Sequence, residues 1–249
     1  MTMLHLVRIA LDLRALTAFS IAERVADDDG GYAAHLALRK RYGSAAPQPF
    51  FLRADGPGGP HIIGYATDPD ALAEAAALPP ADDRLAWIFP DPPASRAMPE
   101  NWRAGARYNF EVRVRPLVRF GGRIREARST REDTWRRRAG EIDAFLAACE
   151  KASGMPVDRE TVYRDWLITR LLGAAEITKA EMVSHQRLRT HRSPHGRLGG
   201  TTTEASEAVF RGALSVADPD AFARLLTRGV GRHAAFGFGM LLLAPPGRV

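Results

Sequence analysis

The sequence predicts an α+β protein made of two tandem ferredoxin-like domains, a topology shared with RNA-recognition motifs (RRM-like). The first 90 residues follow the order strand, helix, strand, strand, helix, strand, which is the split βαβ arrangement of that fold. A proline-rich stretch follows, and the remaining chain repeats the order less cleanly, with one additional helix. An Asp-Pro-Asp-Ala helix start occurs at 68–71 and again at 218–221. We therefore expect a first domain over 1–90, a linker over 91–105 and a second domain over 106–249.

Local patterns define the elements of the first domain. Ala34, Leu38 and Tyr42 recur at helical spacing. The glycine- and proline-rich turn signal at 55–60 separates two short strands, and Pro69 in a first turn starts a helix. In chain order we expect a strand over 3–11, helices over 13–25 and 32–42, strands over 49–53 and 61–66, a helix over 68–78 and a closing strand over 84–89.

The second domain opens with a strand whose side chains alternate. Apolar residues in 108–118 alternate with Glu111, Arg113 and Arg115, which predicts a half-buried strand with its arginines on the open face. Asp218 begins the last helix, as Asp68 does in the first domain. In chain order we expect a strand over 108–118, helices over 134–152 and 158–174, strands over 181–192 and 208–216 joined by the polar stretch 193–206, a helix over 218–227 and a final strand over 238–244.

Composition narrows the class of protein. The 249 residues are 45% hydrophobic and 26% charged, which is typical of a soluble globular protein with a proper core. The single cysteine, Cys149, excludes a disulfide framework and a cysteine-based zinc site, and it suits a reducing cytoplasm. No apolar stretch approaches the roughly 20 residues that span a bilayer, and no leader opens the chain. We expect a cytoplasmic protein without a membrane partner.

Positive charge is concentrated in one segment. The whole chain carries a net charge of +6, whereas residues 103–138 hold 12 arginines against 4 acidic residues, a net charge of +8. The remainder therefore has a net charge of −2. Such a segment indicates a polyanionic partner, and a solvated, charge-rich face is an equally good interpretation of the composition alone.

A glycine-rich run, residues 229–239, lies between the last helix and the last strand. Glycines let the backbone approach a phosphate closely and present N–H groups to it. The dinucleotide-binding fingerprint does not fit, because its glycines follow a strand and open a helix. A tight connection with a helix cap at Gly229 is the alternative. Four glycines with Arg232 and His233 between them exceed what a cap requires, which favours phosphate or RNA contact.

Together with the tandem pattern, this run resembles the end of the CasE-type CRISPR repeat-processing endoribonucleases. That family ends in a helix, a loop of the form Gly-φ-Gly-basic-x-x-Ala-φ-Gly-φ-Gly and a strand, as 229–243 do. Tyr32-Ala33-Ala34-His35 matches a Tyr-x-x-His at the start of the family's first helix, and 110–116 resembles the opening strand of its second domain. Residues 13–29 depart from the family, whose chains pass more quickly from first strand to helix.

The chemistry of Tyr32 and His35 is compatible with RNA cleavage. Residues three apart share one face of a helix, and a histidine near a helix start is favoured in its neutral form. Cleavage without metal requires one group to take the 2′-OH proton and another to protonate the leaving 5′-oxygen, and histidine suits either role. A surface histidine is the interpretation without the resemblance. The resemblance implies His35, Tyr32 and Lys179 as catalytic residues, with Lys179 stabilising the phosphorane.

RNA binding is expected to come from arginines and from the glycine-rich run. We expect no metal and no cofactor, because no His, Cys or carboxylate cluster stands out and Asp27 to Asp29 suit a cap or a solvated turn. The candidate RNA-binding residues are Arg113, Arg115, Arg119, Arg123, Arg125, Arg187, Arg189, Arg192, Gly229, Gly231, Arg232, His233, Gly237 and Gly239.

The resemblance implies a metal-independent endoribonuclease that binds the CRISPR repeat stem-loop. Such an enzyme cuts the precursor at the stem base, leaves 2′,3′-cyclic phosphate and 5′-OH ends, and stays with its product beside other Cascade subunits. The alternative is a non-catalytic tandem RRM-like RNA-binding protein. Whether Tyr32 and His35 face the glycine-rich run distinguishes the two. A protein–protein scaffold would leave the basic segment without a role.

Overall fold

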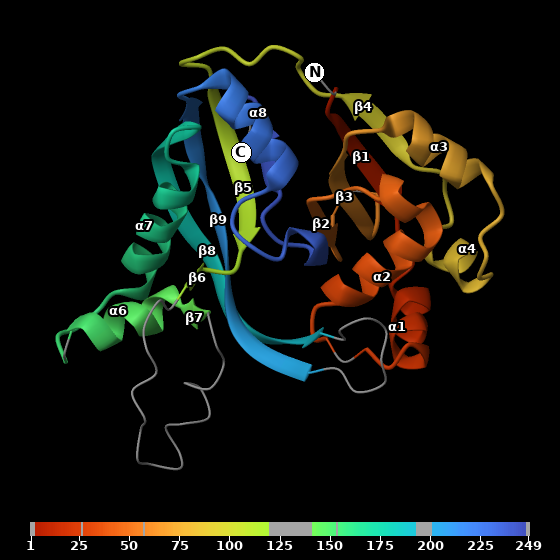
Figure 1. Cartoon of the computed structure of the whole chain (residues 1–249), viewed down its shortest axis with the longest axis horizontal. Coiled ribbons are helices and arrows are strands. Elements are labelled where there is room, and N and C mark those ends of the chain that lie inside the picture. Colours follow the sequence, from red (N-terminus) through yellow and green to blue (C-terminus); the bar gives the residue numbers. More distant parts are fainter. Residues whose placement is uncertain are drawn as a thin grey trace.

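The computed structural model describes residues 3–25, 27–56, 58–119, 141–152, 154–192 and 201–247. At 190–192 and 201–203 it describes the backbone alone. Two lobes, each with a sheet and helices, lie side by side (Figure 1). None of the helices in these ranges combines the length and the apolar character that a membrane span requires.

The N-terminal lobe is one antiparallel sheet in the order β2-β3-β1-β4, which is the ferredoxin-like order. The strands are β1 (His5–Ala10), β2 (Phe50–Arg53), β3 (His61–Ala66) and β4 (Ala94–Ala97). The helices are α1 (Leu13–Ala22), α2 (Gly31–Tyr42), α3 (Pro69–Ala77) and α4 (Arg84–Ile88), with the short 3-10 helix η1 (Gly43–Ala45) after α2. The Asp68 carboxylate caps α3 by accepting the Ala71 N–H at 2.9 Å, as the sequence predicts.

The end of this lobe differs from the prediction. The segment expected to be the closing strand is α4, and the closing strand β4 lies inside the expected linker, where it pairs with β1 from His5↔Ala97 to Arg8↔Ala94. Leu85 and Ile88, three residues apart, are both fully buried, which is a helical pattern. All four residues of β4 are exposed, so main-chain pairing at a sheet edge holds this strand and no apolar alternation marks it.

The C-terminal lobe repeats the same topology. Its sheet has the order β10-β5-β9-β8, antiparallel throughout, so the prediction of two tandem ferredoxin-like domains is confirmed. The strands are β5 (Arg107–Val114), β8 (Ala175–Arg192), β9 (Thr201–Val216) and β10 (Leu241–Ala244). The other elements are α6 (Ala144–Ala152), α7 (Arg159–Leu171), α8 (Pro219–Arg228), the 3-10 helix η3 (Ala234–Phe236) and a small sheet of β6 (Leu117–Val118) with β7 (Ile142–Asp143).

The hairpin of β8 and β9 is longer than expected. β8 begins six residues before the expected strand, and β9 begins at Thr201 within the expected polar connection. The hairpin leaves the C-terminal lobe and reaches the start of α2 (Figure 1). There the Asp28 N–H donates to the Arg189 carbonyl at 3.1 Å, and the Arg189 N–H donates to the Asp28 carboxylate at 2.9 Å. The hairpin therefore touches both lobes.

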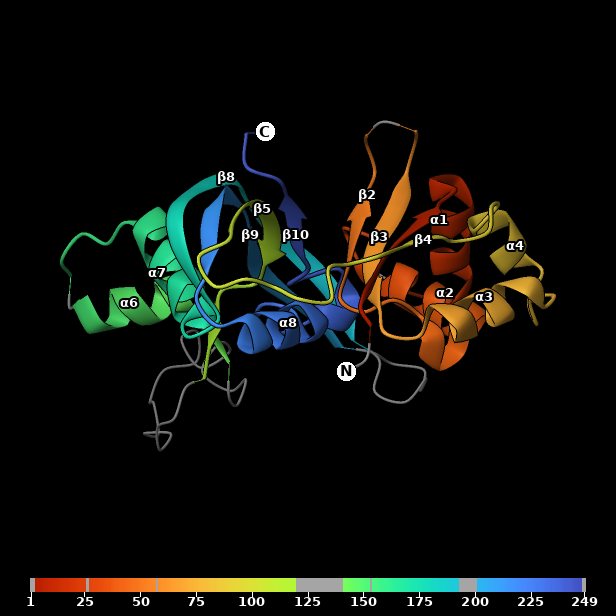
Figure 2. The ribbon, with the colours of Figure 1, turned by 90° about the horizontal axis from the view of Figure 1, so that it is seen from above.

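The lobes meet across the face of the N-terminal sheet that its helices leave uncovered (Figure 2). The buried Tyr65 hydroxyl on β3 donates to the Leu241 carbonyl on β10 at 2.8 Å. Glu111 on β5 pairs with Arg53 of the N-terminal lobe and with Arg211 on β9, both at 2.8 Å. Apolar side chains of the N-terminal sheet pack on the C-terminal core at the same face: Leu4, Leu6, Phe51 and Ile63.

Candidate active site

Two aspartates hold the start of α2. The Asp27 carboxylate accepts the Tyr32 N–H at 2.7 Å, and the Asp29 carboxylate accepts the Gly31 N–H at 3.1 Å. Both satisfy N–H groups that lack a partner within the helix. Burial raises the pKa of Asp27, with the nearby Asp29 charge adding to the effect. The interpretation of these carboxylates as a cap agrees with the structure.

Tyr32 and His35 face the glycine-rich loop, residues 229–239. Their ring centroids lie 5.4 Å and 5.1 Å from that of Phe236, and the His35 and Phe236 rings meet edge to face at 85°. A Cβ on Gly31 would lie 2.5 Å from the Phe236 carbonyl oxygen, so only glycine allows α2 this close to the loop. We call Tyr32, His35 and Phe236 the aromatic cluster. Its geometry favours the catalytic interpretation over the non-catalytic RNA-binding one.

The surroundings of His35 favour its neutral form. Burial lowers the pKa of the His35 imidazole, and the positive charge of Arg39 lowers it further. A hydrogen bond with the Ala235 backbone acts in the opposite direction. The net lowering from an ordinary value near 6.5 leaves the ring largely neutral at pH 7, as a proton acceptor requires.

The ends of the glycine-rich loop are tied to the protein itself. The N–H of Gly229 donates to the Leu225 carbonyl at 2.8 Å, and the Gly239 N–H donates to the Arg113 carbonyl at 2.6 Å. A Cβ on Gly231 would lie 2.7 Å from the Trp166 ring. Gly229, Gly231, Gly237 and Gly239 all have positive φ. Loop closure and packing therefore explain Gly229, Gly231 and Gly239, whose expected role was RNA contact.

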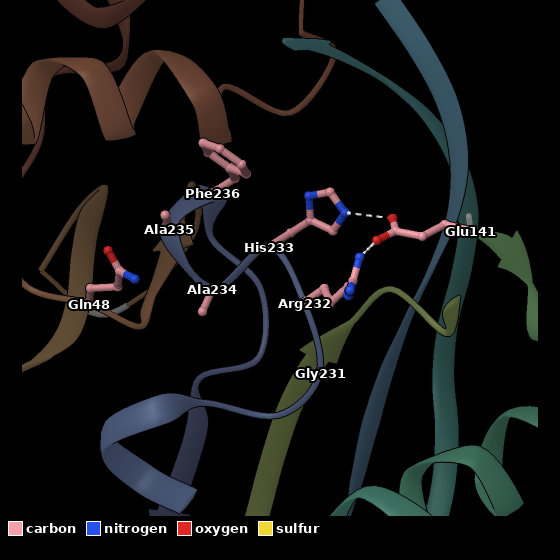
Figure 3. Close-up of a pocket in the computed structure, with 8 residues that line it drawn as sticks. All are labelled: Gln48, Glu141, Gly231, Arg232, His233, Ala234, Ala235 and Phe236. Atoms are coloured by element: carbon pink, nitrogen blue, oxygen red, sulfur yellow. Dashed lines mark ion pairs between the residues drawn. The ribbon is translucent and has the colours of Figure 1, made fainter. Parts of the chain in front are cut away.

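A hollow of about 340 Å³ opens beside the aromatic cluster (Figure 3). Arg232 and His233 reach into it and both pair with Glu141, the His233 Nε2 at 3.9 Å from a carboxylate oxygen. The lining residues are Gln48, Glu141, Gly231, Arg232, His233, Ala234, Ala235 and Phe236. Glu141 is missing from the sequence-based site, because residues 134–152 read as a continuous helix and nothing links this glutamate to a loop 90 residues later.

The expected exposure of Arg113 and Arg115 is wrong. Their residues are 7% and 2% exposed, because the start of α2 and the glycine-rich loop cover this end of β5. Both guanidinium groups lie over the Phe238 ring, with Cζ 4.4 Å and 4.6 Å from its centroid. Arg113 forms ion pairs with Asp29 and Glu207. Neither side chain is presented to a nucleic acid.

Other expected RNA-binding residues are exposed. The Arg187 and Arg189 side chains on β8 are 63% and 69% exposed, and each pairs with one carboxylate, Glu204 and Asp28 respectively. Arg119 is exposed just after β6. Arg123 and Arg125 lie outside the described residues, as does the expected start of a helix at residue 134, and only the backbone of Arg192 is described.

Lys179 is not brought to the aromatic cluster. It is exposed on β8 opposite Ala213. The Arg113 carbonyl holds one end of the glycine-rich loop, and Arg113 pairs with Val209, four residues before Ala213 on β9. Four residues of extended strand span about 13 Å. Tyr32, His35, Arg232 and His233 lie around one loop, and among the described residues no hydrogen bond or ion pair joins Lys179 to any of them.

Comparisons with known proteins point to one family. The model of the CRISPR associated protein family matches residues 4–245. The CRISPR-associated endoribonuclease Cse3 of Thermus thermophilus is 25% identical over 167 residues, which is 66% of each chain. A structure of Cse3 bound to a 19-nucleotide RNA superimposes with a TM-score of 0.64 at 21% identity, over 98% of this chain and all of that one. A chain of a CRISPR RNA-guided surveillance complex superimposes with a TM-score of 0.51 at 15% identity, over 97% of this chain and 99% of that one. The protein therefore belongs to the CRISPR-associated protein family.

Proposed function

We propose that this chain is an endoribonuclease that processes CRISPR repeat RNA and works within a Cascade-type surveillance complex. Its family supports this activity, and so does its 25% identity over 167 residues to Cse3, which is named a CRISPR-associated endoribonuclease. The RNA-bound Cse3 structure and the surveillance-complex chain share its fold over nearly the whole length, which supports RNA as substrate and other Cascade subunits as partners. The observation that carries the proposal is the contact of Tyr32 and His35 with Phe236 beside a hollow lined by Arg232 and His233.

The reaction that fits these residues is attack of the ribose 2′-oxygen on its own phosphate. Neutral His35 takes the 2′-OH proton as the bond from O2′ to phosphorus forms. The bond from phosphorus to O5′ breaks, and the leaving 5′-oxygen takes up a proton. The products carry 2′,3′-cyclic phosphate and 5′-OH ends. The Tyr32 hydroxyl orients the 2′-OH or the phosphate.

No step of this reaction needs a metal ion. The carboxylates closest to the aromatic cluster in sequence, Asp27 and Asp29, are engaged with the N-terminal N–H groups of α2, and Asp29 also with Arg113. Arg232 and His233 are the basic groups that line the hollow. Arg232 supplies positive charge for the scissile phosphate, and His233 offers it a ring nitrogen, once RNA replaces Glu141 as their partner.

Binding of the repeat stem-loop is assigned to exposed basic residues. Arg187 and Arg189 on the hairpin suit contacts with phosphates. Arg119, Arg123, Arg125 and Arg192 stay predictions of the sequence. The position of Lys179 gives no support to a role at the scissile phosphate, and cleavage at the stem base with retention of the product rests on the family resemblance.

A cleavage assay in excess EDTA tests the proposal. Purified protein is mixed with the repeat RNA of its own source, and the product ends are analysed. We expect one cut, a 5′ fragment that resists phosphatase because its phosphate is cyclic, and a 3′ fragment that polynucleotide kinase labels directly. Tight binding without any cleavage would instead support the non-catalytic RNA-binding protein. Cleavage that requires added Mg²⁺ would contradict the mechanism.

A further inference from the structure

A chain of polar groups, buried at Asp29, Arg113 and Glu207 and exposed at Gln186, joins the start of α2 to the long hairpin. The Arg113 Nε donates to the Glu207 carboxylate on β9 at 2.7 Å, and its Nη2 donates to the Asp29 carboxylate at 2.6 Å. The second oxygen of Glu207 accepts from Gln186 on β8 at 2.5 Å. The side chains of Arg113, Asp29 and Glu207 are 9%, 8% and 3% exposed. Asp29 also caps α2 through the Gly31 N–H.

Arg113 holds the glycine-rich loop as well. Its carbonyl accepts the Gly239 N–H at 2.6 Å, and its guanidinium group lies 4.4 Å from the centroid of the Phe238 ring. The planar guanidinium group has donors at fixed angles, so two carboxylates on different elements are held in one geometry. One residue of β5 thus contacts the cap of α2, the loop that carries Phe236, and the hairpin.

We propose that Arg113 is a positioning residue that holds α2 against the glycine-rich loop through Asp29, so that Tyr32 and His35 stay at Phe236 while RNA binds the hairpin. Arg113 does not contact RNA in this role. The expected effect of Arg113 on cleavage rests on the proposed function. Its expected effect on the position of the aromatic cluster rests on geometry alone.

A second interlobe ion pair provides a matched control. Glu111 joins Arg53 of the N-terminal lobe to Arg211 of the C-terminal sheet, at 2.8 Å on each side, and its side chain is 14% exposed. It bridges the same two lobes, but neither Arg53 nor Arg211 belongs to α2, to the glycine-rich loop or to β8. If general adhesion between the lobes were all that mattered, loss of either carboxylate charge would have the same effect.

The test compares Asp29→Asn with Glu111→Gln. Asparagine keeps a side-chain oxygen that can accept the Gly31 N–H, and it loses the charge that faces Arg113. The cleavage rate constant is measured in single turnover at saturating repeat RNA, and affinity is measured with a 2′-deoxy substrate. We expect Asp29→Asn to slow cleavage by about 10- to 100-fold, since a displacement near 1 Å can cost that much. Affinity should change less than about twofold, and Glu111→Gln should change neither quantity by more than about twofold.

An NMR measurement gives a readout that does not depend on cleavage. The Cε1–H signal of His35, assigned by its loss in His35→Ala, should be shifted in the wild type by the ring of Phe236, whose centroid lies 5.1 Å from that of His35. Asp29→Asn should move this signal toward the position of an exposed histidine, and Glu111→Gln should leave it in place. If the wild type fails to cleave, the proposed function is wrong, and the His35 signal still decides the positioning role. An unmoved signal in Asp29→Asn, or a rate loss matched by Glu111→Gln, would overturn the inference.

Discussion

Arg113 on β5 and Arg115 just after that strand lie beneath the glycine-rich loop, whereas Arg187 and Arg189 on the β8–β9 hairpin project into solvent. Arg113 binds two carboxylates that are themselves nearly inaccessible, Asp29 and Glu207. Arg189, whose side chain is 69% exposed, pairs with Asp28, the neighbour of Asp29. Two adjacent aspartates at the start of α2 thus receive arginines with different tasks. The buried arginine fixes the geometry of the site, and the exposed ones are available to a polyanion.

The largest effect is expected at a residue that belongs to neither set of arginines. His35→Ala should slow single-turnover cleavage by about 10²–10⁴-fold, the usual contribution of a general acid or base, because no proton acceptor then faces the 2′-OH. Binding of a 2′-deoxy repeat RNA should stay near the wild-type value. Undiminished cleavage by this variant would show that the active site lies elsewhere. The buried and exposed arginines would then have to be compared relative to that other site.

Removal of the buried arginine should mainly affect stability. Arg113→Ala leaves Asp29 and Glu207 buried without their partner, which costs about 3–5 kcal/mol of unfolding free energy when a buried pair is broken from one side. Denaturant unfolding followed by circular dichroism measures this loss. Arg164→Ala, an exposed arginine on α7 that pairs with Glu160, is the control and should change the unfolding free energy by less than about 0.5 kcal/mol. Equal stability of the two variants would contradict the buried role of Arg113.

Removal of the exposed arginines should mainly affect RNA affinity. If Arg187 and Arg189 contact phosphates, replacing both with alanine makes the dependence of log K on log salt shallower by roughly 0.7–0.9 for each contact. Stability should be nearly unchanged. The measurement is a salt titration of binding to a non-cleavable repeat RNA, again beside Arg164→Ala. A wild-type slope in the double variant would show that Arg187 and Arg189 belong to a solvated surface and do not contact phosphates.

The smallest effect is expected at Glu141. Its carboxylate pairs with Arg232 and His233 at a partly exposed position, so Glu141→Gln should strengthen RNA binding by about two- to fivefold, in keeping with the small free energy of such pairs. Glu150→Gln on the exposed side of α6 changes the net charge equally and serves as control. Equal gains in both variants would mean that overall charge, and not the hollow, determines the effect.

The sequence predicts most of the fold because its signals are local. A few neighbouring residues are enough to predict the helix starts at Asp68 and Asp218 and the helical pattern of α2. β4 has no such local signal, because its four side chains are exposed and it is held by pairing with β1, some 90 residues earlier. The sequence left open whether Tyr32 and His35 face the glycine-rich loop, because no local pattern reports a contact between residues some 200 positions apart, and their roles stay predictions.

The environment of the arginines could not be inferred in the same way. The alternation Glu111, Arg113, Arg115 is the pattern of a strand with one polar face, and it contains no sign that another lobe covers that face. The partners of Arg113 lie 84 residues before it and 94 residues after it. Residues 13–29, which depart from the family pattern, form α1 and the aspartate cap that receives Arg113.

The composition of the aromatic cluster has a consequence for synthesis of the protein. Tyr32 and His35 leave the ribosome some 200 residues before Phe236 does. Domains generally fold in the order in which they are made, so the N-terminal lobe folds first, with Gly31 exposed where the Phe236 carbonyl will later pack. A nascent chain therefore holds Tyr32 and His35 before the loop that carries Phe236 has been made. The contact between α2 and the loop therefore forms late in translation, after both strands of the β8–β9 hairpin have been made.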